Sequence, residues 1–222
     1  MNKPNQPSSD PAPSEQKAGS ERDRNEDWGL VERSQRGDQS AFAELVRRYQ
    51  RKAYSLAFGM VHNADDARDV VQDAFVKVHR HLPNFKGDSS FYTWFYRIVV
   101  NVGIDHVRKH GRNQAVDYDD TVAHDADGPG DGELLPSTLG VNPATALGRR
   151  EIREAIHKAL ETLSPNHRAV LLMRESEGMS YEEMAEAMEC SKGTIMSRLF
   201  HARKNMQRVL IELLGGSNYK VS

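Results

Sequence analysis

The stretch from Ser180 to Lys204 predicts two short helices separated by a tight turn, and it constrains the fold more than any other feature. Ser180 and Glu183 form a capping box, in which each side chain pairs with a backbone N–H that the first helical turn leaves unpaired. The first helix is therefore expected to begin at about Tyr181. After a three-residue turn, Ser191 is placed to cap a second, longer helix. This helix-turn-helix pattern predicts an α-helical domain in this part of the chain.

The second helix of this pair is expected to have two different faces. Its apolar residues recur at helical spacing and form a buried stripe of Ile195, Leu199, Ala202, Met206 and Leu210. Another face is polar and cationic and carries Lys192, Thr194, Ser197, Arg198, His201 and Lys204. Such a face suits the major groove, where a guanidinium pairs with guanine and lysines meet phosphates. The alternative is an ordinary amphipathic helix with solvated charges, but the capped helix and turn before it favour DNA binding.

The overall composition indicates a soluble, globular protein that needs a partner to bind DNA. Of the 222 residues, 38% are hydrophobic and 28% charged, with a net charge of −2. A protein that holds DNA unaided is usually more basic, because phosphate neutralisation supplies much of the affinity. The single cysteine, Cys190, excludes an intramolecular disulfide and fits a reducing compartment. No apolar run has the length of a membrane span or signal-peptide core, so we expect a cytoplasmic protein without membrane insertion.

Periodicity along the chain predicts an all-α fold with two small helical domains. Residues rich in Pro, Ser, Gln and Asn predict a disordered tail, and a segment rich in Asp, Gly and Pro predicts a flexible acidic linker. The expected parts are the tail at 1–27, the first domain at 28–111, the linker at 112–146, the second domain at 147–214 and a C-terminal tail at 215–222.

The first domain contains two helices with distinctive polar faces. A helix over Ala64–His81 leaves an acidic and amide-bearing face outward, formed by Asp65, Asp66, Asp69, Gln72 and Asp73. A second helix over Phe91–His110 is aromatic at its start and then carries Asn101, Asp105, Arg108 and Lys109. Rings beside cations are able to hold unpaired bases. For Trp94, Phe95 and Ile98 the spacing favours a place in the core instead. A surface ion pair is the alternative for Asp105 and Arg108.

Four sequence blocks resemble the extracytoplasmic-function (ECF) group of bacterial sigma factors. They are DDARDVVQDAF at 65–75, SSFYTWFYRIVVNVGIDHVRK at 89–109, LSPNHRAVLLMRESEGMSYEEMAEAM at 163–188 and GTIMSRLFHARK at 193–204. Because the blocks occur in order around a variable linker, the resemblance is far more specific than a helix-turn-helix alone. It covers about residues 28–204. Glu189 and His201 depart from the family pattern, which often has glycine and arginine at these positions.

The resemblance implies a first domain that binds core RNA polymerase and the −10 promoter element, and a second domain that binds the −35 element. Polymerase contacts would fall on Asp69, Gln72 and Asp73. Contacts to −10 DNA would fall on Asn84, Phe85 and Lys86, in a loop that captures a flipped base, and on Asn101, Asp105, Arg108 and Lys109. Contacts to −35 DNA would fall on Lys192, Thr194, Ser197, Arg198, His201 and Lys204. The resemblance also implies an anti-sigma factor as a partner and a role in a stress or envelope response, with no cofactor, metal or catalytic residue of its own.

Two other functions fit parts of the sequence. Asp65, Asp66 and Asp69 have the DDxxD spacing of metal-binding aspartates in helical prenyl-diphosphate enzymes, but no second acidic cluster lies on another strongly apolar helix. A helix-turn-helix regulator that is not a sigma factor would use only residues 163–204, and this leaves the first half unexplained. Cys190 is interpreted as a packing residue of the turn, with a redox sensor as the alternative.

Overall fold

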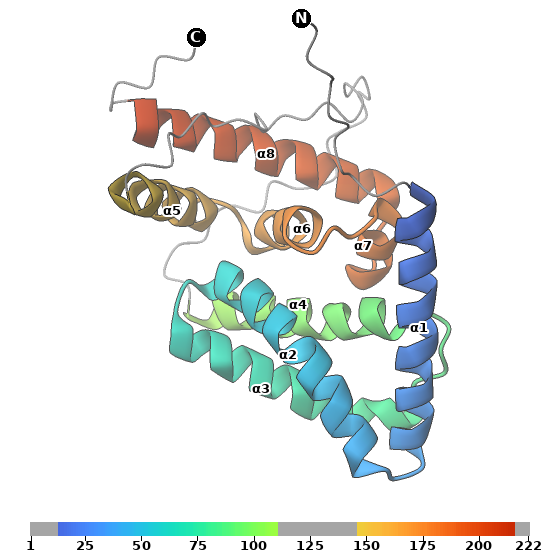
Figure 1. Ribbon diagram of the computed structural model, residues 1–222. Helices are drawn as coiled ribbons and strands as arrows, with labels where there is room; N and C mark the ends of the chain where they lie inside the picture. The colour runs from blue at the N-terminus through green and yellow to red at the C-terminus, as the bar shows by residue number, and fades with distance from the viewer. Residues whose placement is uncertain (1–12, 111–145, 216–222) are drawn as a thin grey trace, which may run out of the picture.

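The computed structural model describes residues 13–110 and 146–215, and all regular structure in these two ranges is helical, which confirms the predicted fold class. The elements are α1 (Pro13–Gln35), α2 (Gln39–Val61), α3 (Ala64–His81), the 3-10 turn η1 (Leu82–Asn84), α4 (Phe91–His110), α5 (Ala146–Glu161), α6 (Pro165–Glu175), α7 (Tyr181–Ala187) and α8 (Lys192–Gly215). Figure 1 shows α2–α4 as one group of helices and α5–α8 as a second group above it, with α1 beside the first group.

The first group is a small bundle in which α2, α3 and α4 all pack against one another. Each helix begins at a polar cap that accepts hydrogen bonds from unpaired backbone N–H groups. Asn63 caps α3 with an Oδ1 that accepts from Asp65 N at 2.8 Å, and Ser90 caps α4 with an Oγ that accepts from Thr93 N at 3.0 Å. As a result α3 and α4 have the bounds that the sequence predicted.

Helix α1 begins at Pro13, so the predicted disordered tail is wrong for residues 13–27. Proline suits the first turn of a helix because its missing N–H has no intrahelical partner there. The deciding contact is tertiary. Asp27 is only 3% exposed, and its carboxylate accepts hydrogen bonds from Arg48 Nη1 at 2.7 Å and from the Tyr49 hydroxyl. Composition alone does not reveal this anchor.

The predicted linker lies outside the described residues, apart from Ala146, where α5 begins. The predicted C-terminal tail also lies outside the described residues, apart from Gly215, where α8 ends. The first twelve residues of the predicted N-terminal tail also lie outside them.

The second group places α8 across α5, α6 and α7. The capping box at the start of α7 is present: Ser180 Oγ accepts from Glu183 N at 3.2 Å, and Glu183 Oε2 accepts from Ser180 N at 2.9 Å. Of the predicted buried stripe on α8, Ile195, Leu199, Ala202 and Met206 are buried and Leu210 is half-buried against the same core. The helix-turn-helix therefore forms as predicted.

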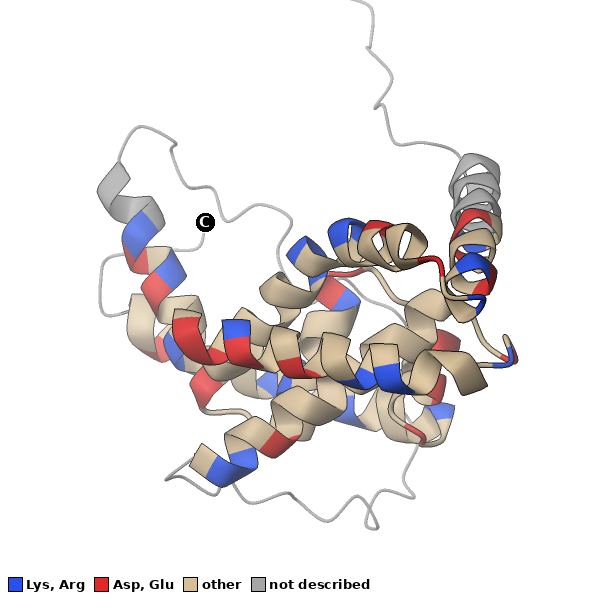
Figure 2. Ribbon diagram, turned by 90° about the horizontal axis from the view of Figure 1, so that it is seen from below, with Lys and Arg blue, Asp and Glu red and all other residues tan. Residues whose placement is uncertain are grey.

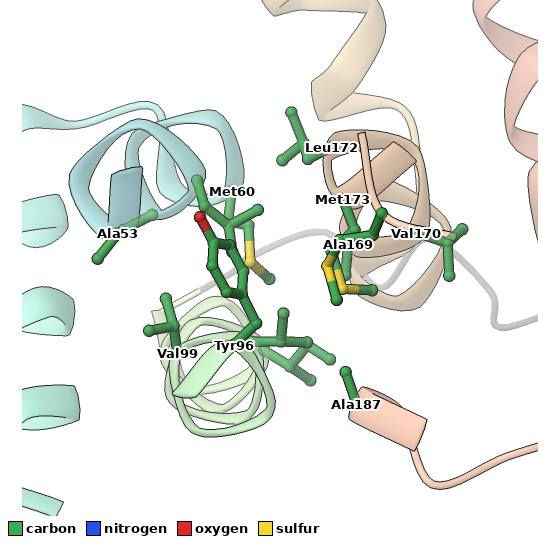
Figure 3. Packing of buried hydrophobic residues seen from close by; sticks show 14 of the residues in the cluster. Ala53, Met60, Tyr96, Val99, Ala169, Val170, Leu172, Met173 and Ala187 are labelled. Carbon is green, nitrogen blue, oxygen red and sulfur yellow. The ribbon is translucent and has the colours of Figure 1, made fainter. Parts of the chain in front are cut away.

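The two groups correspond to the two predicted helical domains, and they pack against each other through one continuous hydrophobic core. Helix α7 lies on α4, and α6 lies on α2 and α4. Figure 3 shows the junction, with Met60 and Tyr96 from the first group facing Ala169, Leu172 and Met173 from α6. Tyr96 and Met60 are completely buried there. Local periodicity shows that these faces are apolar, but it does not show that they meet each other.

Candidate nucleic-acid and polymerase interfaces

The acidic face predicted on α3 lies at the surface. Asp69, Gln72 and Asp73 are all exposed, while Val70 and Ala74 between them are buried. Seen from below in Figure 2, acidic segments lie on the first half of α3 and basic ones toward its end. Val76 continues the same face one turn later and is 50% exposed. Sequence reasoning missed Val76, although its position three and four residues after Asp73 and Gln72 places it on that face.

The loop after η1 presents polar side chains around one buried ring. Asn84 and Lys86 are exposed, as predicted for a loop that meets DNA. Phe85 is 9% exposed, and its ring stacks on Trp94 with centroids 4.6 Å apart. The structure therefore places the Phe85 ring in the core, where it anchors the loop and is not available to stack on a base.

The outer face of α4 carries the polar residues that the sequence singled out. Asn101, Asp105, Arg108 and Lys109 are all exposed and follow one another along the second half of the helix. The aromatic start of the helix is mainly core: Phe95 is completely buried, and Trp94 and Ile98 are packed against the same cluster. The interpretation of these three residues as core is thus confirmed.

The outer face of α8 differs in part from the face predicted on sequence. His201, Lys204 and Lys192 are exposed and Ser197 is half-buried, as expected for a DNA-facing surface. The same face also carries Met196, which is 54% exposed, and Phe200, which is 41% exposed. Apolar side chains contact the thymine methyl group in the major groove, so exposed Met and Phe suit a DNA-reading surface. Sequence reasoning missed both residues. Their exposure could have been inferred because neither belongs to the predicted buried stripe.

Two residues predicted to contact −35 DNA, Thr194 and Arg198, have side chains that contact the turn between α7 and α8. Arg198 is half-buried, with Nη1 3.9 Å from Cys190 Sγ. Thr194 Oγ1 lies 2.9 Å from Ser191 Oγ, which also accepts from Thr194 N at 3.0 Å as the helix cap. Lys192 forms an ion pair with Glu182 of α7. These side chains therefore brace the turn as well as bordering the outer face.

The turn between α7 and α8 adopts a backbone conformation that favours glycine. Glu189 has φ of +51°, in the left-handed region that residues with a Cβ rarely occupy. This geometry explains why a glycine would suit the position. The Glu189 carboxylate accepts from Arg97 Nη1 at 3.1 Å, which ties the turn to α4. Cys190 is half-buried and packed against the core, in agreement with its interpretation as a packing residue.

The aspartates that suggested an enzyme lie on the exposed start of α3. Asp65 forms an ion pair with Arg68 one turn later. Across residues 13–110 and 146–215, no group of three or more His, Cys, Asp and Glu side chains is arranged to hold a metal ion. Among the helices of these same ranges, none combines the length and apolar character that crossing a membrane requires.

Comparisons with known proteins agree with this arrangement. The Sigma-70 region 2 family matches residues 45–113, and the Sigma-70 region 4 family matches residues 153–206. The RNA polymerase sigma-H factor of Pseudomonas aeruginosa is 43% identical over 190 residues, covering 85% of this chain and 96% of that protein. The ECF RNA polymerase sigma-E factor of Escherichia coli K12 is 42% identical over 178 residues, covering 80% and 91%.

Two solved structures have a similar fold. The sigma factor RpoE of Bartonella quintana, solved in complex with the anti-sigma factor NepR, has a TM-score of 0.53 and 25% identity over 76% of this chain and 96% of that one. CnrH, solved in complex with the cytosolic domain of CnrY, has a TM-score of 0.61 and 24% identity over 84% and 98%, which shows a shared fold.

The chain belongs to the ECF group of RNA polymerase sigma factors. It binds core RNA polymerase and promoter DNA and directs the polymerase to specific promoters for transcription initiation. A regulator that uses only the helix-turn-helix does not account for the region 2 match over the first half.

Proposed function

We propose that each of the three exposed faces has a separate role in transcription initiation. The α3 face with Asp69, Gln72, Asp73 and Val76 binds core polymerase. The loop of residues 84–90 and the outer face of α4 bind the −10 strand and assist its opening, while the outer face of α8 reads the −35 element. One observation carries this assignment: each face presents exposed polar side chains on a helix whose opposite side is buried in the core. The polymerase supplies the chemistry, in the cytoplasm where it works.

The base-capture role of the loop is supported by its fixed shape. The loop runs from Asn84, the last residue of η1, to Ser90, which precedes α4. Both elements pack in the core, so the loop is held in place before DNA arrives. A preformed pocket loses little conformational entropy when it receives a base. Extruding a base costs a few kcal/mol, and a pocket that recovers this energy for one base selects that base.

An anti-sigma factor is proposed as the regulatory partner, with release in a stress or envelope response. The related sigma factor RpoE was solved with such a partner. Its binding would compete with core polymerase if it covers the α3 face or holds the two helical groups together. Pull-down of this chain with its genomic neighbours, followed by competition with core polymerase, tests the proposal; a partner that leaves polymerase binding unchanged would contradict it.

The polymerase-binding face is tested by removing its polar groups. Asp69→Ala with Gln72→Ala deletes exposed side chains from α3, so we expect at least tenfold weaker association with core polymerase, a loss of about 1.4 kcal/mol or more. The melting temperature should change little because both side chains point into solvent. Gln50→Ala is the control, since it removes an exposed amide side chain from a different helix, α2. Unchanged association of the double variant would rule out this face.

A further inference from the structure

The loop proposed to capture a base is held by a side chain from α1. Gln35 is the last residue of that helix, and its Nε2 donates to Leu82 O at 2.9 Å and to Phe85 O at 2.8 Å. The two carbonyls stand at the start and just after the end of η1. A side-chain amide has two N–H donors, and Gln35 uses them on these two carbonyls. The backbone that leads into the loop is thereby fixed from a helix 47 residues away in sequence.

A second residue of α1 lies against the loop backbone. Gly87 has φ of +78°, and a Cβ added there would lie 2.5 Å from Cζ3 of the Trp28 indole. The indole ring therefore covers the Gly87 backbone at van der Waals distance. Phe85 lies between Trp28, with ring centroids 6.2 Å apart, and Trp94, with centroids 4.6 Å apart. Trp28 itself remains 37% exposed.

Helix α1 is itself anchored firmly enough to act as a support. Trp28 and Gln35 are two turns apart and lie on the same face. Val31 between them is completely buried, and Asp27 is held by Arg48 and Tyr49 of α2. Helix α1 consequently holds the loop backbone at Phe85 and Gly87, while Lys86 and Asp88 remain exposed.

We infer that α1 is part of the strand-capture site, with Trp28 and Gln35 acting as positioning residues that hold residues 85–88 in the shape that accepts one unpaired base of the −10 strand. This inference rests on the proposed function of the loop. Neither side chain needs to touch the base. Their removal lets the backbone of the loop relax, so the pocket loses selectivity among bases before the domain loses its fold.

The test uses holoenzyme assembled from the full chain and core polymerase. A promoter is first mapped by sequencing the transcripts that this holoenzyme makes. Binding is then measured to pre-melted versions in which each non-template base of the −10 element is replaced in turn by the other three. The ratio of affinities for the preferred base over the others gives the discrimination at each position. Core association and melting temperature are measured alongside.

Gln35→Glu keeps the size of the side chain but removes both donors, because an ionised carboxylate only accepts. We expect discrimination at one −10 position to fall roughly tenfold, the scale of about 1.4 kcal/mol, while core association stays unchanged. Trp28→Ala should give the same loss at the same position, and Trp28→Phe should restore much of it. Arg36→Ala is the matched control. Arg36 follows Gln35 in the sequence, is exposed, and forms a surface ion pair with Glu32 at 3.7 Å.

Parental discrimination in both Gln35→Glu and Trp28→Ala would overturn the inference. An equal loss at every −10 position, or loss together with core association, would also overturn it, because that pattern indicates general unfolding of the domain. If the parent holoenzyme itself shows no base preference in the −10 strand, the proposed role of the loop fails instead, and the inference falls with it.

Discussion

At the scale of single residues, buried polar contacts decide how the helices are joined. Asp27 has a side chain only 4% exposed, and it bonds to Arg48 at 2.7 Å and to the Tyr49 hydroxyl. A carboxylate in such a place is stable only because both neighbours satisfy it. Glu26 approaches the same guanidinium at 3.1 Å but is 61% exposed. Both acids contact Arg48, but the buried Asp27 should contribute more to the stability of the fold than the exposed Glu26.

Asp27→Ala should lower the free energy of unfolding by about 2–3 kcal/mol, because it removes the buried carboxylate that accepts from Arg48 Nη1 and from the Tyr49 hydroxyl. Glu26→Ala, the control, should cost less than about 1 kcal/mol because the pair is exposed. Urea unfolding followed by circular dichroism measures both. Equal losses in the two variants would show that burial is not what distinguishes them.

At the scale of elements, close packing of α2 against α6 joins the two halves of the molecule. Gly59 on α2 faces Leu172 on α6, and a Cβ at position 59 would lie 2.8 Å from Leu172 Cδ2. The absence of a side chain at 59 is what lets the helices approach this closely. Arg168 of α6 strengthens the contact by donating to the Met60 carbonyl at the end of α2.

Gly59→Leu should destabilise the protein by about 1–3 kcal/mol, since the added side chain overfills the contact between α2 and α6. Adding Leu172→Ala should recover much of this loss, because it restores the space. Gly29→Leu is the control: no atom lies within 4 Å of its Cβ position, so it should stabilise through helix propensity. Melting temperatures of the four proteins test the prediction, and a fully stable Gly59→Leu would refute it.

At the scale of the whole molecule, the two helical groups are locked together by polar contacts around their shared core. Tyr92 donates to Glu177 O at 3.2 Å, the Tyr96 hydroxyl donates to the Glu177 carboxylate, and Arg97 donates to Glu189. Burial, followed by the Glu177 contact, raises the pKa of Tyr96, so its hydroxyl remains a donor.

The −10 and −35 elements are about 25 base pairs apart, or about 85 Å at ~3.4 Å per base pair. Helices α4 and α8 both pack against α6 and α7, so they lie much closer together than that distance. We therefore expect the two groups to separate when both promoter elements are bound.

Glu177→Ala removes the acceptor of the Tyr96 hydroxyl and should shift the free protein toward separated groups. Dyes on Arg51→Cys and Gln207→Cys, in a Cys190→Ala background, report the distance by energy transfer. We expect lower transfer in the free variant and faster association with core polymerase, while the fully bound state matches the parent. Glu175→Ala, which breaks a contact within the second group, is the control. Unchanged transfer and rate would show that this contact does not hold the groups together.

Acid should also loosen the junction. Burial, followed by the nearby charges of Arg168 on α6 and His157 on α5, lowers the pKa of His62 to about 4. When the groups part, His62 returns toward its ordinary pKa of about 6.5 and takes up a proton more readily. The closed packing is therefore fully stable above about pH 6.5 and weakens as the pH falls toward 4. Energy transfer across this range measures the effect, and His62→Asn, which tolerates the left-handed backbone at 62, should flatten it. A profile identical to the parent would exclude His62 as the cause.

Sequence patterns were enough to predict most of the helices, their caps and the family. Periodicity and capping residues located α3, α4 and α7, because these signals depend on neighbours in the chain. It also placed most polar site residues correctly on exposed faces, since a residue opposite a buried stripe must face outward.

Tertiary structure alone decided the rest. The start of α1 and the burial of Phe85 depend on which surfaces meet. The junction of the two groups has the same origin: an apolar stripe shows that a face is buried, but its partner is fixed only when Gly59, Tyr96 and Leu172 come together in space.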